Sequence, residues 1–560
     1  MASRRHTVAR AGWSFGHRAA VVGAAGVALV LSACGGDDDG DGGGQAGGPT
    51  GAVVISGCNP QNPLIPANTN ETCGGNPQQQ GIFSMLVRYD PDTAAPEMEI
   101  AESIESDDNI TWTVTLKDGW TFHDGSPITA NSFVDAWNWA ALGESAALNS
   151  YFFEPIEGFA EVQGEFDAEG AYIEGSATAE TMSGLEVVDD RTFTITLTSP
   201  QSAFPQRLGY TAFAPLPEAF FDDIDAFGLA PIGSGPFEVV EYNENVDIQL
   251  SAYDGYAGDT QPSVQDVTFR IYTDQNAEYN DLLADNVDVM TQLPETSLAG
   301  EQYKADLGDR FIERETGVIQ TITFAPEAVD PTVASTDLRK GLSMAIDRDL
   351  IIQNIFQGTR EPATGWVSPV VDGYQPESCG EFCTYDPEAA TELVAASGFT
   401  GTLTLSYNAD ADHAGWTEAT CNSIRNATGV DCVATPVVDF ATFRAAINAR
   451  EMTGMFRTGW QMDYPHIENF LVPLYATGAS ANDGDYSNPD FDAKLDEAAS
   501  APSSEEAIAL YQEAELMLAE DMPSIPLWYG KTIAGYSSNV DNVKITPFST
   551  TDLLSITLAE

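Results

Sequence analysis

The sequence predicts an α/β protein with two or three lobes. Strands and helices alternate between residues 320 and 525, which is typical of a sheet with parallel strands. Before residue 320, hairpin signals are mixed with helical segments. About 510 residues follow the N-terminal signal and tether, and a chain of this length is too long for one small hydrophobic core.

The alternation in the second half rests on apolar periodicity and on capping signals. We expect helices over residues 338–356, 385–396, 413–427 and 439–447, and strands over residues 402–407, 430–433, 454–460 and 525–529. Asp439 is placed to cap one helix, and Gly398 to end another. Ser503 and Glu506 form a capping box for a last helix, which ends before Pro523.

Apolar and polar residues alternate in the first half and predict strands there. Trp112, Val114 and Leu116 mark one face of a strand, and a turn at residues 117–119 leads to a return strand from Trp120 to Phe122. A helix capped by Thr129 and strands over residues 193–197 and 237–241 follow.

Residues 1–33 contain the parts of a secretory signal peptide. A basic front, made by Arg4, Arg5, Arg10 and Arg18, precedes an uncharged stretch that ends at Ala33. This stretch of roughly 15 residues is too short for a comfortable membrane span. Small residues before Cys34 resemble the lipobox of bacterial lipoproteins, which implies a lipid on Cys34 and an anchor in the cell membrane.

Two alternatives to this signal stay open. One is an ordinary secretory signal with an incidental cysteine, and the other is a twin-arginine signal at Arg4 and Arg5, which the following residues match poorly. Residues 34–51 are rich in Gly and Asp and predict a flexible tether between the lipid and the folded part.

The chain is strongly acidic, with 85 acidic and 23 basic residues and a formal charge of −62. We therefore expect no nucleic-acid partner. A solvated acidic surface is the simplest interpretation, and steering of cationic ligands, screened within roughly 10 Å, is the alternative. After the signal there is no Gly-x-Ser-x-Gly and no His-Glu-x-x-His motif, so we expect neither an enzyme nor a cofactor.

Six cysteines follow Cys34, and an even number in an exported chain favours disulfides. They fall into three local pairs: Cys58 with Cys73, Cys379 with Cys383, and Cys421 with Cys432. The sequence allows other pairings as well. Zinc-ligand spacing is absent, so we expect no metal site.

Nine motifs occur in a fixed order between about residues 80 and 547. They are residues 101–104, 120–130, 184–197, 233–237, 338–348, 385–389, 459–464, 486–492 and 514–526. In this order they resemble the oligopeptide-binding proteins of ABC importers, within the peptide/nickel family of solute-binding proteins. The resemblance implies a two-lobed fold of the periplasmic-binding-protein type, class II, with an inserted domain.

The resemblance also implies domain boundaries. Lobe I would combine residues 52–98, 228–315 and 525–560, the inserted domain would cover residues 99–227, and lobe II would cover residues 316–524. Because the chain crosses between the lobes more than once, the crossings would form a hinge.

A receptor for many peptides has to bind the features that all peptides share. The strand at Gly459, Trp460 and Gln461 resembles the family's peptide-pairing strand, which would bind the ligand backbone by β-augmentation. By the same resemblance, Asp463 pairs with the ligand ammonium and Arg457 with its carboxylate. His413 aligns with a histidine of similar task, and Trp460 would line a side-chain pocket.

Each of these residues has a structural alternative: Asp463 as a loop cap before Pro465, His413 as a surface or capping residue, and Trp460 as core. The chain departs from the family at residues 76–80, where the backbone pairing from lobe I would lie.

The implied function is capture of oligopeptides by a monomer and delivery to an ABC permease and ATPase. The alternatives are a dipeptide, oligosaccharide or metal-chelate receptor, and a peptide sensor without transport.

Overall fold

The computed structural model describes residues 48–57, 59–60, 62–68, 81–167, 171–409, 411 and 413–560, which belong to one compact unit that begins at Gly48. The predicted signal peptide, Cys34, the pair of Cys58 with Cys73, and residues 76–80 lie outside the described residues.

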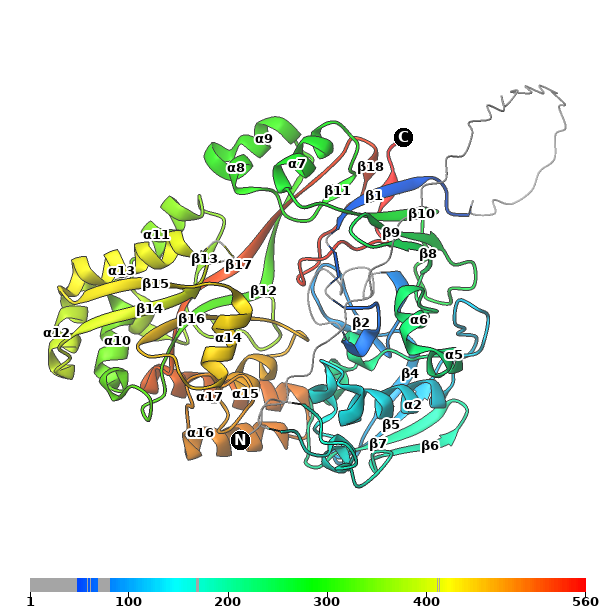
Figure 1. Ribbon diagram of the computed structural model, residues 1–560, viewed down its shortest axis with the longest axis horizontal. Coiled ribbons are helices and arrows are strands. Elements are labelled where there is room, and N and C mark those ends of the chain that lie inside the picture. The colour runs from blue at the N-terminus through cyan, green and yellow to red at the C-terminus, as the bar shows by residue number, and fades with distance from the viewer. Residues whose placement is uncertain are drawn as a thin grey trace, which may run out of the picture. The chain divides into compact units, whose positions relative to one another are not determined.

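An eleven-stranded sheet organises the described chain (Figure 1). Its order is β15 (Asp431–Val437), β14 (Thr402–Asn408), β16 (Met455–Gln461), β12 (Phe311–Phe324), β17 (Ser524–Tyr536), β11 (Val289–Met290), β1 (Ala52–Gly57), β10 (Asp266–Ile271), β9 (Asp247–Ala252) and β8 (Phe237–Asn243), and β13 (Glu361–Pro362) pairs with β17. Strand β14 is parallel to β15 and β16, and β1 is parallel to β10 and β11, whereas β12 is antiparallel to both of its neighbours.

A separate antiparallel sheet has the order β4 (Ala101–Glu105), β5 (Thr111–Leu116), β7 (Thr192–Thr196) and β6 (Leu185–Asp189). Helix α2 (Ala130–Ala141) packs on it, since Phe133 stacks on Phe193 and Trp137 meets Phe193 edge to face. Two short sheets complete the strands: β2 (Val87–Tyr89) with β3 (Pro96–Met98), and β18 (Val540–Asp541) with β19 (Thr557–Leu558).

The remaining α-helices fall into three stretches of the chain. The first stretch contains α3 (Phe159–Gln163), α4 (Phe204–Arg207), α5 (Glu218–Asp222) and α6 (Ile224–Leu229), and the second α7 (Gln275–Leu283), α8 (Glu295–Leu298) and α9 (Gln302–Leu307). The third contains α10 (Thr336–Met344), α11 (Arg348–Ile355), α12 (Pro387–Ser397), α13 (Ala414–Thr428), α14 (Phe440–Asn448), α15 (Glu468–Tyr475), α16 (Pro489–Ala499) and α17 (Ser504–Asp521).

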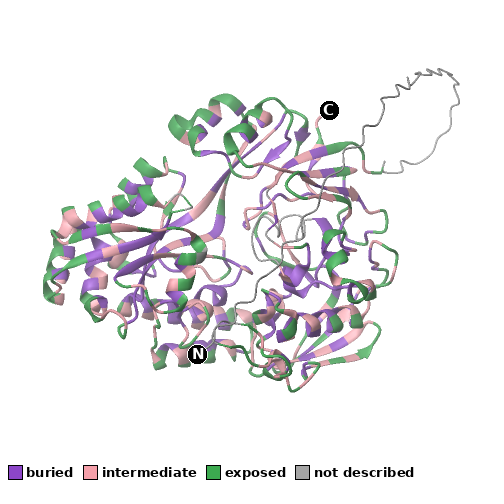
Figure 2. Cartoon of the chain, in the orientation of Figure 1, coloured by how far each residue is buried: buried purple, intermediate pink, exposed green. Residues whose placement is uncertain are grey.

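Two large hydrophobic clusters form the core. The first cluster consists mainly of residues from Val53 to Val289, with C-terminal residues such as Leu553. It joins the β8–β10 end of the large sheet to the four-stranded sheet. The other extends from Ile319 to Tyr529 and buries α10, α13 and α17 against β12, β14 and β17. Buried segments, purple in Figure 2, follow β12, β14 and β17. The predicted lobe boundaries themselves stay a prediction.

Several sequence predictions are confirmed. Asp439 caps α14 through a bond from the Thr442 N–H (2.7 Å), and Ser503 caps α17 through a bond from the Glu506 N–H (3.2 Å). Gly398 ends α12 in the left-handed conformation, at φ 71°. The predicted disulfides Cys379–Cys383 and Cys421–Cys432 are both present.

Two predictions of local structure are wrong. The helix expected over residues 338–356 is two helices, because the Asp347 side chain accepts from the Leu350 N–H (3.0 Å) and starts α11 anew. The strand expected from Trp120 to Phe122 is absent, because β5 already pairs with β4 and β7, and only an isolated bridge joins Thr121 to Pro127. Of the described helices, none is long and apolar enough to cross a membrane.

The long strands β12 and β17 belong to both clusters. Phe311–Glu315 of β12 pair with Lys531–Gly535 of β17, and Ile319–Thr323 pair with Ser524–Tyr529, with a register shift between the two stretches. Gly530 faces this shift, and a Cβ there would lie 2.6 Å from the Thr316 hydroxyl and 2.7 Å from the Val318 Cβ. The two strands can therefore approach at this point only because Gly530 has no side chain.

Gly530→Ala should lower the free energy of unfolding by about 1–3 kcal/mol, because the added methyl group overpacks the junction of β12 and β17. Urea denaturation of wild type and variant measures this difference. Gly401→Ala is the matched control, since its Cβ would meet nothing closer than 3.6 Å. Equal stability of the two variants would show that the junction can accommodate the added methyl group without loss of stability.

Candidate functional site

Strand β16 has one edge that is only partly paired. Its residues from Met455 to Gln461 all pair with β12, but only Met455 and Phe456 pair with β14 on the other side. In the part of the chain that the structure describes, no strand covers the second edge from Arg457 onward. Such an edge presents backbone donors and acceptors to an incoming extended chain.

Asp463 follows this edge and is held by Asn469. The Asp463 N–H donates to the Asn469 side-chain oxygen (2.9 Å), and the Asn469 amide donates to the Asp463 carboxylate (3.0 Å). The same Asn469 oxygen accepts from the Trp460 indole N–H (3.1 Å). Asn469 is buried, so a fixed amide links the two predicted ligand residues.

Burial dominates the electrostatics of Asp463. It raises the pKa of the carboxyl from 3.8 to about 6, against the opposing effects of the Asn469 hydrogen bond and the positive charge of Arg207. A half-buried carboxyl of this kind is stabilised in its ionised form by a cation that is brought to it.

Asp463 lies in the wall of a cavity of about 360 Å³. Aromatic residues and two cations share this wall: Phe83, Tyr89, Tyr210, Tyr256, Phe548, Arg88 and Lys544. Tyr89 stacks on Phe548 with 5.1 Å between ring centroids. The cavity therefore brings residues of the first hydrophobic cluster to the carboxyl of Asp463.

Arg457, Gly459 and Trp460 line a second cavity, of about 400 Å³. The Arg457 Nε donates to the Asn408 side chain (2.8 Å), and its guanidinium lies over the rings of Phe440 and Phe443, at 5.3 and 5.5 Å. These contacts fix the guanidinium at the wall of the cavity.

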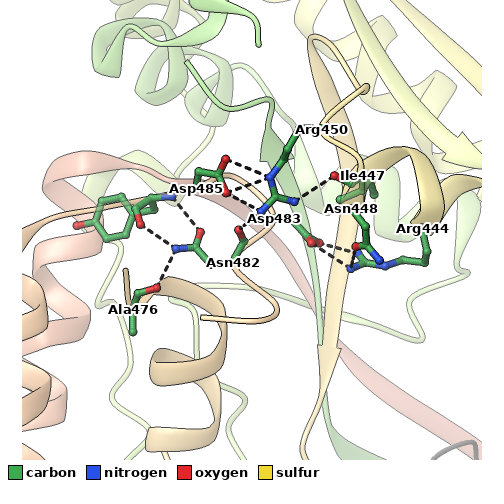
Figure 3. Close-up of polar contacts among 9 residues, drawn as sticks. Arg444, Ile447, Asn448, Arg450, Ala476, Asn482, Asp483 and Asp485 are labelled. Carbon is green, nitrogen blue, oxygen red and sulfur yellow. Dashed lines mark hydrogen bonds and ion pairs between the residues drawn. The ribbon is translucent and has the colours of Figure 1, made fainter. Parts of the chain in front are cut away.

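Three residues of the second cavity's wall, Arg444, Asn482 and Asp483, belong to a set of polar contacts (Figure 3). Arg444 of α14 bonds both carboxylate oxygens of Asp483, at 2.7 and 3.0 Å, and Arg450 pairs with Asp485 at 2.6 Å. The Asn482 amide donates to the Ala476 and Tyr486 carbonyls, which closes the loop beneath. These bonds tie α14 to residues 476–486 and hold that wall in place.

Gln461 and His413 line a third cavity, of about 530 Å³. The His413 Nδ1 accepts from the Trp416 indole N–H (3.0 Å), and His413 stands at the N-cap of α13. Arg360 and Lys531 supply positive charge to the same cavity.

The structure thus distributes the six predicted ligand residues over three cavities that lie along β16 and its continuation. Asp463 lines the first, Arg457, Gly459 and Trp460 the second, and Gln461 and His413 the third. Among the described residues, no group of three His, Cys, Asp or Glu side chains could hold a metal ion.

Sequence reasoning missed Asn469, Arg207, Arg360 and the two phenylalanines under Arg457. Asn469 carries a weak signal, since it is a polar residue directly before the apolar run Phe470–Leu471. Arg207 carries none, because its link to Asp463 depends on how distant segments pack.

Comparison with known proteins now gives the family. Residues 95–482 match the model of the "Bacterial extracellular solute-binding proteins, family 5 Middle". The chain belongs to this family. It is 25% identical to the oligopeptide-binding protein OppA of Bacillus subtilis over 528 residues, which are 90% of this chain and 92% of that protein.

The relatives of this chain are named for more than one kind of solute. The chain is also 25% identical to heme-binding protein A of Haemophilus influenzae over 557 residues, covering 94% of this chain and 96% of that protein. Among solved structures, the unliganded open form of the periplasmic murein tripeptide-binding protein MppA superimposes with a TM-score of 0.76 at 22% identity, over 91% of this chain and 97% of that chain. The predicted two-lobed fold of the periplasmic-binding-protein type is confirmed.

Asp463→Asn should stabilise the ligand-free protein at neutral pH. Because the pKa of Asp463 in the folded protein lies above its ordinary value, its contribution to stability is full below about pH 4 and is lost as the pH rises through 6. The variant should exceed wild type by about 1–2 kcal/mol near pH 7.5, and the difference should shrink toward pH 4.

Urea denaturation of ligand-free protein at several pH values measures this difference. Asp107→Asn, at an exposed position outside the helices and strands, is the control and should unfold at the same urea concentration as wild type at neutral pH. A difference for Asp463→Asn that does not depend on pH would contradict the raised pKa.

Proposed function

We propose that this chain is an extracytoplasmic lipoprotein that captures oligopeptides and delivers them to an ABC permease. The observation that carries the proposal is the uncovered edge of β16, which leads directly to the Asp463 carboxyl. An extended peptide that pairs with this edge brings its ammonium to a carboxyl whose ionised form lacks sufficient solvation.

The roles of the ligand residues follow from this placement. Gly459 and Gln461 contribute backbone groups of the edge, Asp463 binds the ligand ammonium, and Arg457 binds a ligand carboxylate with a guanidinium that Asn408 already orients. Trp460 lines a side-chain pocket, and His413, together with Arg360, meets the carboxylate of ligands that reach the third cavity.

The names of relatives support a peptide ligand. The similar Bacillus protein is named for oligopeptides, and the similar solved structure for a murein tripeptide. Because that structure is named as an unliganded open form, we infer that this chain also alternates between open and closed forms. Residues 52–98, 228–315 and 525–560 would then form lobe I, which carries the inserted domain 99–227, and residues 316–524 lobe II.

The experiment that tests the function is native mass spectrometry of residues 35–560, purified without refolding, with sequencing of the molecules that co-purify. A series of small masses that resolve as mixed peptides supports the oligopeptide receptor and gives the preferred length. A single non-peptide mass, such as a heme or a sugar, would overturn the peptide ligand and leave the family unchanged.

Asp463→Ala should weaken binding of peptides with a free N-terminus by at least about tenfold, because the ammonium loses its partner on leaving water. Calorimetry with a free and an N-acetylated tripeptide separates this effect from loss of fold, since the acetylated peptide should bind both proteins equally weakly. Arg457→Ala is the matched variant for the other end: it should weaken only peptides whose free C-terminal carboxylate reaches Arg457, and equal loss for the C-amidated peptide would contradict that role. Unchanged affinity of Asp463→Ala would remove Asp463 from the site.

Cys34→Ser should release the protein from the membrane fraction, because the substituted residue has no thiol to acylate. Fractionation of cells that produce each form, with detection of the protein in membrane and medium, measures the effect. Retention of the serine variant in the membrane fraction would rule out the lipid anchor on Cys34.

A further inference from the structure

A buried ion pair joins two distant parts of the sequence next to the candidate site. Arg207, the last residue of α4, pairs with Glu468, the first residue of α15, and the two are 261 positions apart. Their side chains are 12% and 6% exposed. Arg207 lies in the proposed inserted domain and Glu468 in proposed lobe II, so the pair links two bodies that would move apart on opening.

Tyr464 connects this ion pair to the ligand carboxyl. The Arg207 guanidinium lies over the Tyr464 ring at 5.4 Å, and the Tyr464 hydroxyl donates to the second carboxylate oxygen of Glu468 (2.7 Å). Tyr464 directly follows Asp463 in sequence. The position of the turn that carries Asp463 therefore depends on whether Arg207 is in place.

The surface around the pair is polar. The Asn109 amide donates to the Ala501 carbonyl (2.8 Å), and the Ser202 N–H donates to the Ala499 carbonyl (3.1 Å). The Tyr89 hydroxyl, from the wall of the first cavity, donates to the Gln206 carbonyl (2.6 Å). The segment at residues 201–207 therefore contacts the first cavity and α16, and the Gln206 amide also donates to the Ser504 hydroxyl at the start of α17 (3.5 Å).

Several buried polar atoms on this surface have no hydrogen-bond partner within the described residues. They are Gln201 Oε1, Ser202 Oγ, Gln206 Oε1, Arg207 Nε and His466 Nε2. Buried polar groups are nearly always paired in permanent interiors, because an unpaired group loses its solvation without compensation. Interfaces between domains that move relative to one another are more polar than permanent interiors, and the polar surface around Arg207 is of this kind.

We propose that Arg207 is a positioning residue for ligand capture. Its ion pair with Glu468 forms when the segment at residues 201–207 meets α15–α17, and it holds the turn of Asp463 and Tyr464 in the geometry that receives the ligand ammonium. Opening separates the pair and releases the turn. This inference rests on the proposed function, and the ion pair is distinct from the groups that would touch the peptide.

Three other arginines of the described chain form ion pairs that do not cross this contact. Arg444 with Asp483 and Arg450 with Asp485 lie entirely within residues 444–485, on one side of the moving contact. Arg191, which pairs with Glu102 and Asp118, lies with both partners in the proposed inserted domain and is 40% exposed. Arg191 therefore supplies a control from the same domain.

The test uses residues 35–560 as wild type, Arg207→Gln, Arg207→Lys, Glu468→Gln and the control Arg191→Gln. Small-angle scattering gives the radius of gyration with and without tri-alanine, and calorimetry gives the affinity for tri-alanine and for its N-acetylated form. We expect Arg207→Gln and Glu468→Gln to have a larger radius and at least tenfold weaker binding of tri-alanine. Arg207→Lys should recover part of both, and Arg191→Gln should match wild type.

Unchanged radii and affinities within twofold in both glutamine variants would overturn the proposal. Equal losses of affinity in Arg207→Lys and Arg207→Gln would also overturn the proposal. Lysine keeps the positive charge and glutamine does not, so equal losses would mean that packing, and not the ion pair, causes the effect. If Arg207→Gln fails to fold, Glu468→Gln provides the same test from the other partner. Failure of wild type to bind any peptide would refute the proposed function instead, while the radii without ligand still test the ion pair.

Discussion

The junction of β12 and β17 is the constraint on which the rest of the structure depends. These two strands contribute to both large hydrophobic clusters, and their register shifts at the point where they pass from one cluster to the other. Gly317 and Gly530 make the passage possible, since a Cβ on Gly317 would lie 2.3 Å from Met462 and one on Gly530 would reach Thr316. If the proposed lobes move relative to one another, this junction is where the hinge is expected, because only here do the two strands pass between the clusters.

The candidate site derives its geometry from the same strands. Because β12 pairs with the whole of β16, it fixes one edge of β16, and beyond the end of β14 no strand of the described residues covers the other edge. The Met462 N–H donates to the Gly317 carbonyl (2.8 Å), so the residue before Asp463 is attached directly to the junction. Asn469 and the Arg207–Glu468 pair then hold Asp463 from the side of α15. The Asp463 carboxyl thus lies close to the junction of β12 and β17, to the edge of β16 and to the segment at residues 201–207.

Local patterns in the sequence predicted what local forces determine. Asp439, Ser503 and Gly398 stand at the helix ends where their capping chemistry places them, and cysteines close in sequence form the described disulfides. The failures have tertiary causes. Residues 120–122 have the alternating apolar pattern of a strand, but β4 and β7 already pair with both edges of β5. The buried amide of Asn469 and the partner of Arg207 could not be predicted, because each depends on segments brought together only by the fold.

The distribution of charge indicates how so acidic a chain would bind the carboxylate of its proposed ligand. Only 23 basic residues accompany 85 acidic ones, and four of the basic residues precede Cys34. Six others line the three cavities: Arg88 and Lys544, Arg444 and Arg457, and Arg360 and Lys531. Solvent screens the exposed carboxylates over roughly 10 Å, whereas charges in a cavity wall act on a ligand through a medium of lower dielectric constant. Under the proposed function, a ligand carboxylate would therefore meet the guanidinium of Arg457 in the second cavity, whose wall has two cations and one carboxylate, whereas the ammonium would meet Asp463 in the first cavity, whose wall has four carboxylates and two cations.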